Sequence, residues 1–374
     1  MAWSVWVCDT VSGEKLQRLP VAAFSWSRVL NGSGSGSATV KLNDAAVKKL
    51  NARTLTNPVS NTLVLDWDGV VVYAGVIWSR DYNREGTSLT LGHADIWSIL
   101  SRRFAVNHYE SPIELWKTTY TGISLQQFAK NLMILGIYGH ENANAMLPIT
   151  LPADSTGTIK RTLYGYHLGN LVDALEDVMN ESNGPDIDFR PRWVSGALNW
   201  EMRVGTTANP KLPAGTYEWN LSASKSGMFD FTVKEDAEKL VTNMVAIGEG
   251  TEQDMLVRSN RIVNPTYPHL ERALSYKSES DGDRLYELAN GGLQVYKTPT
   301  TQWAFSVKAS GTPKSGGGLD VRNKVTALLP GGTARVYVQS DPWLANGWHT
   351  HRLVQFSGDL SEDVKLEFQP DGGV

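Results

Sequence analysis

The segment LVLDWDGVVVYAGVIW, residues 63–78, constrains the fold more than any other part of the chain. Asp68-Gly69 lies near its centre and is a preferred pair for a two-residue β-hairpin turn, because both central positions of that turn need positive φ. The run from Val70 to Trp78 is almost wholly apolar and rich in β-branched residues, which favour sheets over helices. The segment therefore predicts a hairpin whose second strand is central in a barrel or sandwich.

The rest of the first hundred residues is typical of short strands joined by turns. Alternating side chains predict strands with one buried face at residues 3–7, 23–27, 38–42 and 88–92. The sequence NGSGSGS, between Leu30 and Ala38, predicts a flexible loop. Asp95 is expected to cap a short helix that ends at Arg102-Arg103, whose charges suit a helix C-terminus.

The middle third combines helices and strands. Ser124 precedes an i, i+3, i+4, i+7, i+8 apolar stripe that predicts an amphipathic helix: Leu125, Phe128, Ala129, Leu132 and Met133. Gly136 is where this helix is expected to stop. A second helix is predicted from about Asn170 and ends before Asn183. Strands at 187–190 and 198–204 complete an α+β insert.

The last third returns to strand patterns. Strands are predicted at 229–233, 244–247, 303–307, 352–356 and 364–368, and a weak helical pattern covers 271–288. Residues 325–329 and 334–338, joined through Pro330-Gly331-Gly332, predict a second hairpin. The two hairpins indicate β-rich modules at both ends of the chain.

Composition excludes several classes of protein. The 35 Lys and Arg against 39 Asp and Glu leave a net charge of −4 without a basic run, which disfavours a nucleic-acid binder. The single cysteine, Cys8, excludes an internal disulfide framework and a multi-thiolate metal site. Because no apolar stretch reaches about 18 residues and the N-terminus does not resemble a signal peptide, we expect cytosolic synthesis and no membrane anchor.

Few residues offer chemistry, and we predict neither catalytic residues nor a cofactor site. Walker A, HExxH, GxSxG and CxxC patterns are absent from the sequence. His349 and His351 would lie on one face of a strand and could hold a metal if Asp341 joined them. In the simpler interpretation, the two histidines lie at the edge of a strand beside Trp343 and Trp348 and hold no metal.

Asp186 and Asp188 form a DxD pattern that could bind a metal or act as acid and base. They flank Ile187 at the start of an alternating strand. A half-buried strand whose polar side chains face outward would have the same DxD sequence pattern. The strand interpretation is preferred because no partner acid or base stands out.

Tryptophan is abundant, and its position in the sequence separates two groups. Core or interface burial is predicted where tryptophan lies in alternating or apolar runs: Trp3, Trp6, Trp26, Trp67, Trp78 and Trp97. Trp343 and Trp348 lie in a Gly-, Asn- and Pro-rich loop and are the candidates for an exposed contact.

Four segments of the chain together carry a resemblance to a known family. The first is the strand pair of residues 24–42 around NGSGSGS, which leads to Asn43 and a short helix at 45–50. The hairpin of residues 63–78 follows, and then TSLTLGHADIWSILSRR, with its strand–glycine–x–x–aspartate–helix–arginine order. With VTALLPGGTARVYV as the fourth, these segments resemble the tail-tip hub family, the minor tail proteins of long-tailed siphophages infecting actinobacteria, and the fourth is similar to part of the family's second barrel.

The resemblance implies a mainly β fold with two β-barrel hub domains per subunit. The expected domains are a first barrel at 1–104, an α+β insert with two amphipathic helices at 105–215, and a β-rich region with the second barrel at 216–374. Three copies would form a pseudo-sixfold ring at the virion tail tip. Because the chain ends soon after the second barrel, at Phe368-Gln369-Pro370, we expect no built-in lysin.

The function expected from this resemblance is structural and not enzymatic. The homotrimer would connect the tail tube and distal tail protein to a tip spike or fibre, next to the tape measure protein, and DNA would pass through without specific binding. One alternative is a carbohydrate- or receptor-binding virion protein that uses Trp343, Trp348 and Asp341. The other is a cell-wall hydrolase with Asp186 and Asp188 as its acids.

Overall fold

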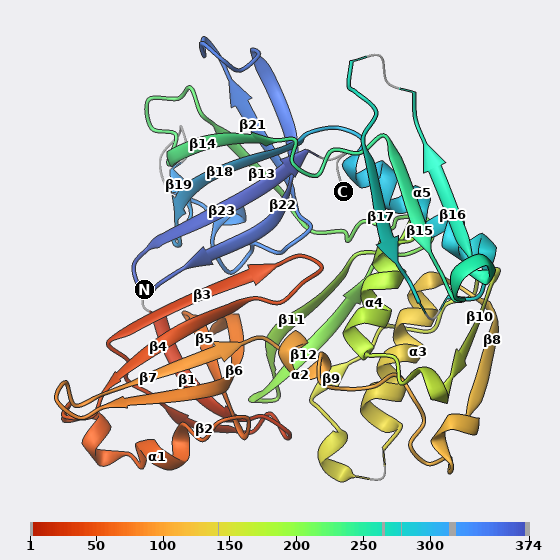
Figure 1. Ribbon diagram of the computed structural model, residues 1–374. Coiled ribbons are helices and arrows are strands. Elements are labelled where there is room, and N and C mark those ends of the chain that lie inside the picture. The colour runs from red at the N-terminus through yellow and green to blue at the C-terminus, as the bar shows by residue number, and fades with distance from the viewer. Residues whose placement is uncertain (1–2, 141, 264–265, 278, 314–318, 371–374) are drawn as a thin grey trace.

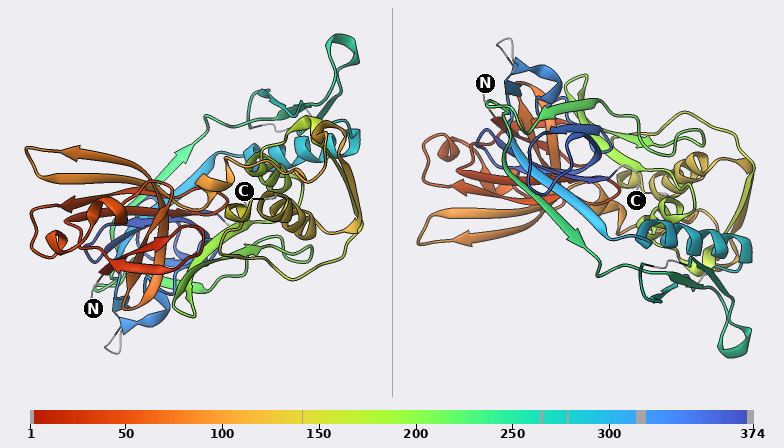
Figure 2. Two further views of the ribbon diagram at one scale, coloured as in Figure 1. Left: turned by 90° about the horizontal axis from the view of Figure 1, so that it is seen from below. Right: turned by 90° about the horizontal axis from the view of Figure 1, so that it is seen from above.

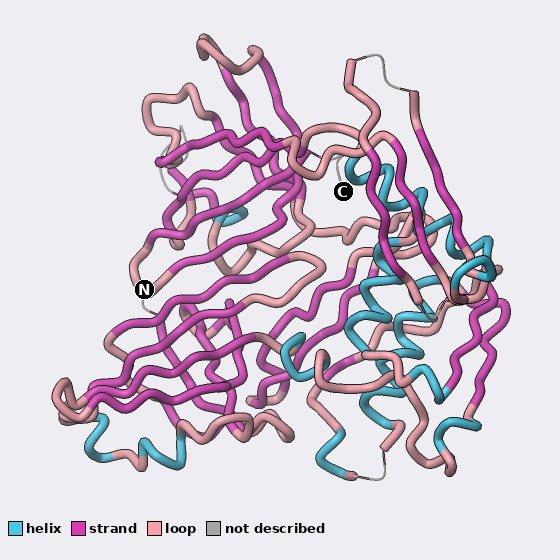
Figure 3. The backbone as a smooth tube through the Cα atoms, viewed as in Figure 1, coloured by secondary structure: helices cyan, strands magenta, loops and turns pink. Residues whose placement is uncertain are grey.

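A computed structural model describes residues 3–140, 142–263, 266–277, 279–313 and 319–370 (Figure 1). Its main element is a 13-stranded sheet in the order β14-β18-β23-β22-β3-β4-β7-β6-β5-β1-β2, from which β21 and then β13 branch at β22. Two α+β units lie beside this sheet, and Figure 3 shows that most of the helix is confined to them. The predicted class, mainly β with an α+β insert, is confirmed.

The N-terminal β module contains seven strands of the sheet. They are β1 (Trp3–Asp9), β2 (Lys15–Arg18), β3 (Ala23–Val29), β4 (Ser35–Lys41), β5 (Asn61–Trp67), β6 (Val70–Asn83) and β7 (Ser88–Ala94). Short helices join or follow them: η1 (Val47–Lys49), α1 (Ala52–Leu55) and α2 (Trp97–Leu100). The predicted Gly/Ser loop is partly strand, because β4 begins at Ser35 and pairs with both β3 and β7.

The hairpin of β5 and β6 forms as predicted. Asp68 and Gly69 have φ of 52° and 82°, the turn geometry that the Asp-Gly pair favours. Every residue of β5 is buried, because the two faces of the strand enter different cores. Leu63 and Leu65 face the interior of the main sheet, whereas Val64 packs against the first α+β unit. Burial on both faces explains why this part of the sequence is almost continuously apolar.

The C-terminal β module contains the other six strands. They are β13 (Thr216–Asn220), β14 (Phe229–Asp236), β18 (Thr300–Lys308), β21 (Thr333–Val338), β22 (Gly347–Gly358) and β23 (Asp363–Pro370). A separate two-stranded pair, β19 (Thr312–Pro313) and β20 (Leu319–Asp320), leads to the short helix η6 (Val321–Asn323).

The two β modules form one open sheet and not the two closed barrels that were expected. β22 pairs with β3, so that Phe356 lies opposite Arg28 and Gly358 opposite Trp26. One continuous core fills both modules, and the rings of Trp26 and Phe356 meet edge to face at 5.5 Å across the junction. β22 pairs with β3 over residues 355–358 and with β21 over residues 347–352.

The second predicted hairpin, 325–338, is wrong in its first arm. β21 pairs with β13 in parallel and with β22 antiparallel, whereas residues 325–329 form a turn and loop. Val325 and Leu328 are nevertheless buried in the main core. The Tyr217 hydroxyl holds this loop, accepting from Leu329 N and donating to Ala327 O. The apolar pattern of residues 325–329 therefore indicated that side chains are buried, but not that they belong to a strand.

The first α+β unit follows β7 and packs on the outer face of the N-terminal module (Figure 2). Its strands are β8 (Lys117–Ile123), β9 (Ile149–Thr150), β10 (Ile159–Tyr164), β11 (Ile187–Val194) and β12 (Ala197–Val204). Its helices are η2 (Ile113–Leu115), α3 (Leu125–Tyr138), η3 (Ala143–Ala145), η4 (Gly165–His167) and α4 (Leu171–Asn180). The caps Ser124 and Asn170 begin α3 and α4 as predicted, each accepting from backbone N–H groups.

Gly136 does not end α3, contrary to the prediction. The helix continues to Tyr138, and Gly139 caps it. A Cβ on Gly136 would lie 2.4 Å from the Leu171 side chain, so that the missing side chain allows α4 to approach. The glycine is explained by helix packing and not by a helix stop.

The second α+β unit interrupts the C-terminal module between β14 and β18. It contains β15 (Asn243–Ile247), η5 (Glu252–Asp254), β16 (Val257–Arg261), β17 (Glu271–Ser275) and α5 (Gly282–Tyr296) around a small core of its own. The weak helix predicted at 271–288 is therefore a strand followed by a helix that begins later. Gly291 brings α5 against the carbonyl of Asn180, at the end of α4.

Replacing Gly69 tests the hairpin that organises the N-terminal module. Gly69→Val should lower the free energy of unfolding by at least about 1 kcal/mol, because a β-branched residue resists positive φ. A Cβ at Gly69 meets no atom within 4 Å, so the cost is backbone strain and not a clash. Urea unfolding should show a smaller loss for Gly69→Asn, since asparagine tolerates positive φ. Equal losses in the two variants would contradict this account.

Candidate functional site

Asp186 and Asp188 are buried, contrary to the prediction that they face outward. They lie at the start of β11 and are only 6% and 4% exposed. Arg28 Nη2 donates to both carboxylate oxygens of Asp188, at 3.1 and 3.2 Å, and Arg203 Nη1 donates to Oδ2 at 3.0 Å. The strand β11 is buried on both faces where it begins, and the arginines Arg28, Arg203 and Arg352 cover the carboxylates that were predicted to face solvent.

Asp186 is equally well satisfied. Its Oδ2 accepts from Leu212 N at 2.8 Å and forms an ion pair with Arg352, whose guanidinium is also buried. Its Oδ1 accepts from Asn31 Nδ2 at 2.9 Å. Neither carboxylate is open to a substrate, so the pair has the geometry of a structural joint and not of an acid–base dyad.

We call Asp186, Asp188, Arg28, Arg203 and Arg352 the charged joint. It connects three parts of the fold: the carboxylates and Arg203 belong to the first α+β unit, Arg28 to β3 and Arg352 to β22. Burial, and then the charges of Arg28 and Arg203, lower the pKa of the nearby Arg190. Because its residues come from these elements, the charged joint lies where β3, β11 and β22 meet.

Neutralising Asp188 should destabilise the protein strongly. Asp188→Asn leaves the buried Arg28 and Arg203 without their counter-charge, which we expect to cost about 3–5 kcal/mol in urea unfolding. Asp154→Asn is the matched control, because the carboxylate of the Lys130–Asp154 pair is 85% exposed. The control should leave the unfolding midpoint unchanged. Similar stabilities of the two variants would contradict the role of the joint.

The two histidines do not assemble a metal site with Asp341. The rings of His349 and His351 are nearly parallel with centroids 6.4 Å apart, and His351 packs on Trp303 at 4.1 Å. Asp341 Oδ1 instead accepts from two N–H groups of its own loop. Burial, aided by His349, lowers the pKa of His351 to about 4. Within the described ranges, no group of three or more metal-ligating side chains comes together.

The predicted contact residues Trp343 and Trp348 lie at the tip of the β21–β22 hairpin. Trp343 is 77% exposed and Trp348 is 49% exposed. The Arg335 guanidinium lies over the Trp348 ring at 4.5 Å, and Tyr337 packs beside it. Of the tryptophans predicted to be buried, Trp26, Trp67 and Trp97 are buried, whereas the others are partly exposed. Whether Trp343 and Trp348 bind a partner stays a prediction.

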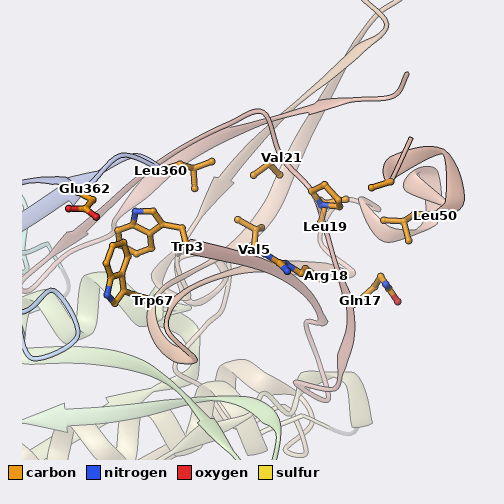
Figure 4. A pocket seen from close by; sticks show the side chains of 12 residues that line it. Trp3, Val5, Gln17, Arg18, Leu19, Val21, Leu50, Trp67, Leu360 and Glu362 are labelled. Atoms are coloured by element: carbon orange, nitrogen blue, oxygen red, sulfur yellow. The ribbon is translucent and has the colours of Figure 1, made fainter. Parts of the chain in front are cut away.

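A groove in the N-terminal module was not foreseen from the sequence. It has a volume of about 650 Å³ and lies between β1, β2, the residues Ala46 and Leu50 on either side of η1, and the β22–β23 turn (Figure 4). Trp3 and Trp67, whose rings meet edge to face at 4.6 Å, form one end, and Leu19 lines its middle. The partial exposure of Trp3 is the feature that the alternating pattern could not reveal, because neighbouring strands decide it.

A polar cavity of about 740 Å³ lies between the two α+β units. Arg284 of α5 crosses it and pairs with Glu181 at 3.0 Å and with Glu279 at 2.7 Å. Asp177 of α4 lies close to these groups. Burial, and the carboxylates Glu279, Glu181 and Asp173 after it, raise the pKa of Asp177 to about 6, although Arg284 opposes the shift.

This raised pKa predicts a pH-dependent effect on stability. The folded protein binds the Asp177 proton more tightly than the unfolded chain, whose aspartates titrate near about 3.9. The ionised carboxylate therefore destabilises the fold as pH rises from about 4 through about 6. Asp177→Asn should unfold at higher urea than wild type at pH 8, and the difference should disappear near pH 4. An equal difference at both pH values would exclude titration as its cause.

None of the helices in the described part of the chain is long and apolar enough to cross a bilayer.

Comparison with known proteins defines the fold but not the family. No protein-family model matches the sequence, and no curated protein matches it significantly. The structure is similar to that of the tail protein from Neisseria meningitidis MC58, with a TM-score of 0.55, 13% identity, and coverage of 100% of this chain and 98% of that one. The 43 kDa tail protein of prophage MuSo2 from Shewanella oneidensis gives a TM-score of 0.57 at 9% identity, covering 99% and 100%.

A third similar structure comes from a larger protein. A chain of the Francisella PdpA–VgrG complex gives a TM-score of 0.51 at 8% identity, and the match covers all of this chain but 58% of that one. The matches to the two tail proteins extend over 99% or more of this chain, so the chain shares its overall fold with them.

Proposed function

We propose that this protein is a structural, non-enzymatic component of a phage tail, and specifically a tail-tip hub. The observation that carries the proposal is the match of the whole architecture, over 100% of this chain and 98% of the Neisseria meningitidis tail protein. The chain in this proposal forms a homotrimeric ring at the virion tail tip. The ring joins the tail tube and distal tail protein to a tip spike or fibre and lies next to the tape measure protein.

The arrangement of the β modules supports a ring. One chain carries two β modules joined edge to edge through β3 and β22, so three chains would supply six modules around an axis. The ends of an open sheet are surfaces that another chain can cover. A net charge of −4 per chain suits a channel through which DNA passes without being bound.

We propose a non-enzymatic role because the two candidate acids are buried and already hydrogen-bonded. Asp186 and Asp188 are engaged by arginines and backbone or amide N–H groups, which disfavours the alternative of a cell-wall hydrolase. No cofactor is invoked. The choice of a siphophage infecting actinobacteria rests on the sequence resemblance in the first hundred residues.

The alternative of a carbohydrate- or receptor-binding virion protein is favoured by one observation. Trp343 is exposed on the loop between β21 and β22, where its backbone N–H donates to Asp341, and Trp348 is exposed at the start of β22. Indole rings stack on the apolar faces of sugars, so this function predicts saturable glycan binding that Trp348→Ala abolishes.

The mass of the assembled protein tests the hub proposal. Light scattering and sedimentation over a range of concentrations should show a monomer–trimer equilibrium, and negative-stain images should show threefold rings. Trimers that appear only when the distal tail protein is added would also support the proposal. A stable dimer, or a monomer that stays monomeric with that partner, would contradict it.

A further inference from the structure

The loop that carries Trp343 is built to hold an indole in solvent. Asp341 Oδ1 accepts from Trp343 N and Leu344 N, both at 2.8 Å, and Asn346 Oδ1 accepts from Ser340 N at 2.7 Å. The carbonyl of Ala345 is hydrogen-bonded to His349 Nε2 at 2.7 Å. These bonds order the loop although Trp343 remains 77% exposed. An ordered, protruding indole loses little entropy on binding, as expected of an anchor that enters a pocket.

The groove offers such a pocket on the same chain. Leu19 and Trp67 are almost fully buried and form its floor, while Trp3, Val21 and Leu360 are partly exposed along its rim (Figure 4). Its volume of about 650 Å³ lies in the range of sites that enclose ligands larger than one indole. The loop is convex and apolar, and the groove is concave and apolar.

The charges around the two surfaces are also complementary. The groove has Glu362 beside Trp3 and Arg18 farther along it, both exposed (Figure 4). The loop has the carboxylate of Asp341, whose pKa is lowered by the two N–H groups of its loop, and the guanidinium of Arg335 lies at its base. Arg18 of the groove can therefore face the carboxylate of Asp341, whereas Arg335 is already paired with Glu218 of its own chain at 2.6 Å.

A single chain cannot make this contact with itself in the observed fold. The β21–β22 hairpin projects at the top of Figure 1, whereas β1 and β2, which border the groove, lie in the lower part of the view. The groove is bordered mostly by the N-terminal module, with Leu360 and Glu362 from the β22–β23 turn, whereas the Trp343 loop joins β21 to β22. A contact between different surfaces of two copies is heterologous, and repeated contacts close a ring when the rotation between copies fits.

We propose that the Trp343 loop of one copy docks in the Trp3–Trp67 groove of a second copy. The contact joins the C-terminal module of one copy to the N-terminal module of the next, and three such contacts close the ring. This inference rests on the proposed homotrimer and names the surfaces that build it.

Cross-linking between copies tests the contact directly. Two single variants of the full chain, Ala345→Cys and Leu360→Cys, are mixed and oxidised, so that Trp343 is kept while the exposed Ala345 of its loop carries the thiol, and a covalent pair should form only in the mixture. The native Cys8 should not interfere, because it is buried and burial raises its pKa to about 12. Tyr82→Cys mixed with Leu360→Cys is the matched control, since Tyr82 is a similarly exposed aromatic residue at 60% and lies on β6, outside the groove and the loop.

Alanine variants measure the energy of the same contact. Trp343→Ala should raise the dissociation constant of the trimer about 30-fold or more, as expected for the loss of a central tryptophan anchor, while Tyr82→Ala leaves it unchanged. Thermal unfolding of the Trp343→Ala monomer should match wild type.

The possible failures are distinguishable. Trimers that persist in Trp343→Ala without a specific cross-link would overturn the docking inference and leave the hub proposal intact. A wild-type chain that never trimerises and never cross-links would overturn both. Saturable binding on a glycan array that Trp343→Ala abolishes, without a cross-link, would overturn the docking inference in favour of carbohydrate recognition.

Discussion

The buried pairing of Asp186 and Asp188 with arginines is the interaction on which the rest of the structure depends. The carboxylates enter from the first α+β unit, while Arg28 and Arg352 come from β strands more than 300 residues apart in the sequence. Apolar burial holds these parts together without specifying direction. A buried charge that loses its partner is costly, so the charged joint admits one arrangement of β3, β11 and β22.

This arrangement makes one sheet from the two ends of the chain. Because β22 pairs with β3, the C-terminal module continues the N-terminal one, and a single core fills both. The α+β units are inserted between strands of the sheet and cover part of it, leaving the groove near Trp3 and the loop of Trp343 uncovered. In the proposed tail-tip hub, these uncovered surfaces are the ones through which the protein would contact its neighbours.

Local patterns predicted the elements whose burial is decided locally. The Asp68-Gly69 hairpin and the capped helices α3 and α4 form as expected, since turn geometry and apolar periodicity are properties of the segments themselves. The hairpin at 325–338 failed because Val325 and Leu328 are buried from a loop that Tyr217 holds. Of the candidate site, the projecting loop with Trp343 and Trp348 could be foreseen from its composition, but the groove could not.

The sequence by itself determined that this chain is mainly β, that an α+β segment interrupts it, and where its strongest hairpin and helices begin. Only the tertiary structure decided that Asp188 is buried, that β3 and β22 join two modules into one open sheet, and that Trp3 lines a groove. The physical reason is the range of the interactions. Periodicity reports which face of an element is buried, whereas its partner is set by contacts between residues that are hundreds of positions apart.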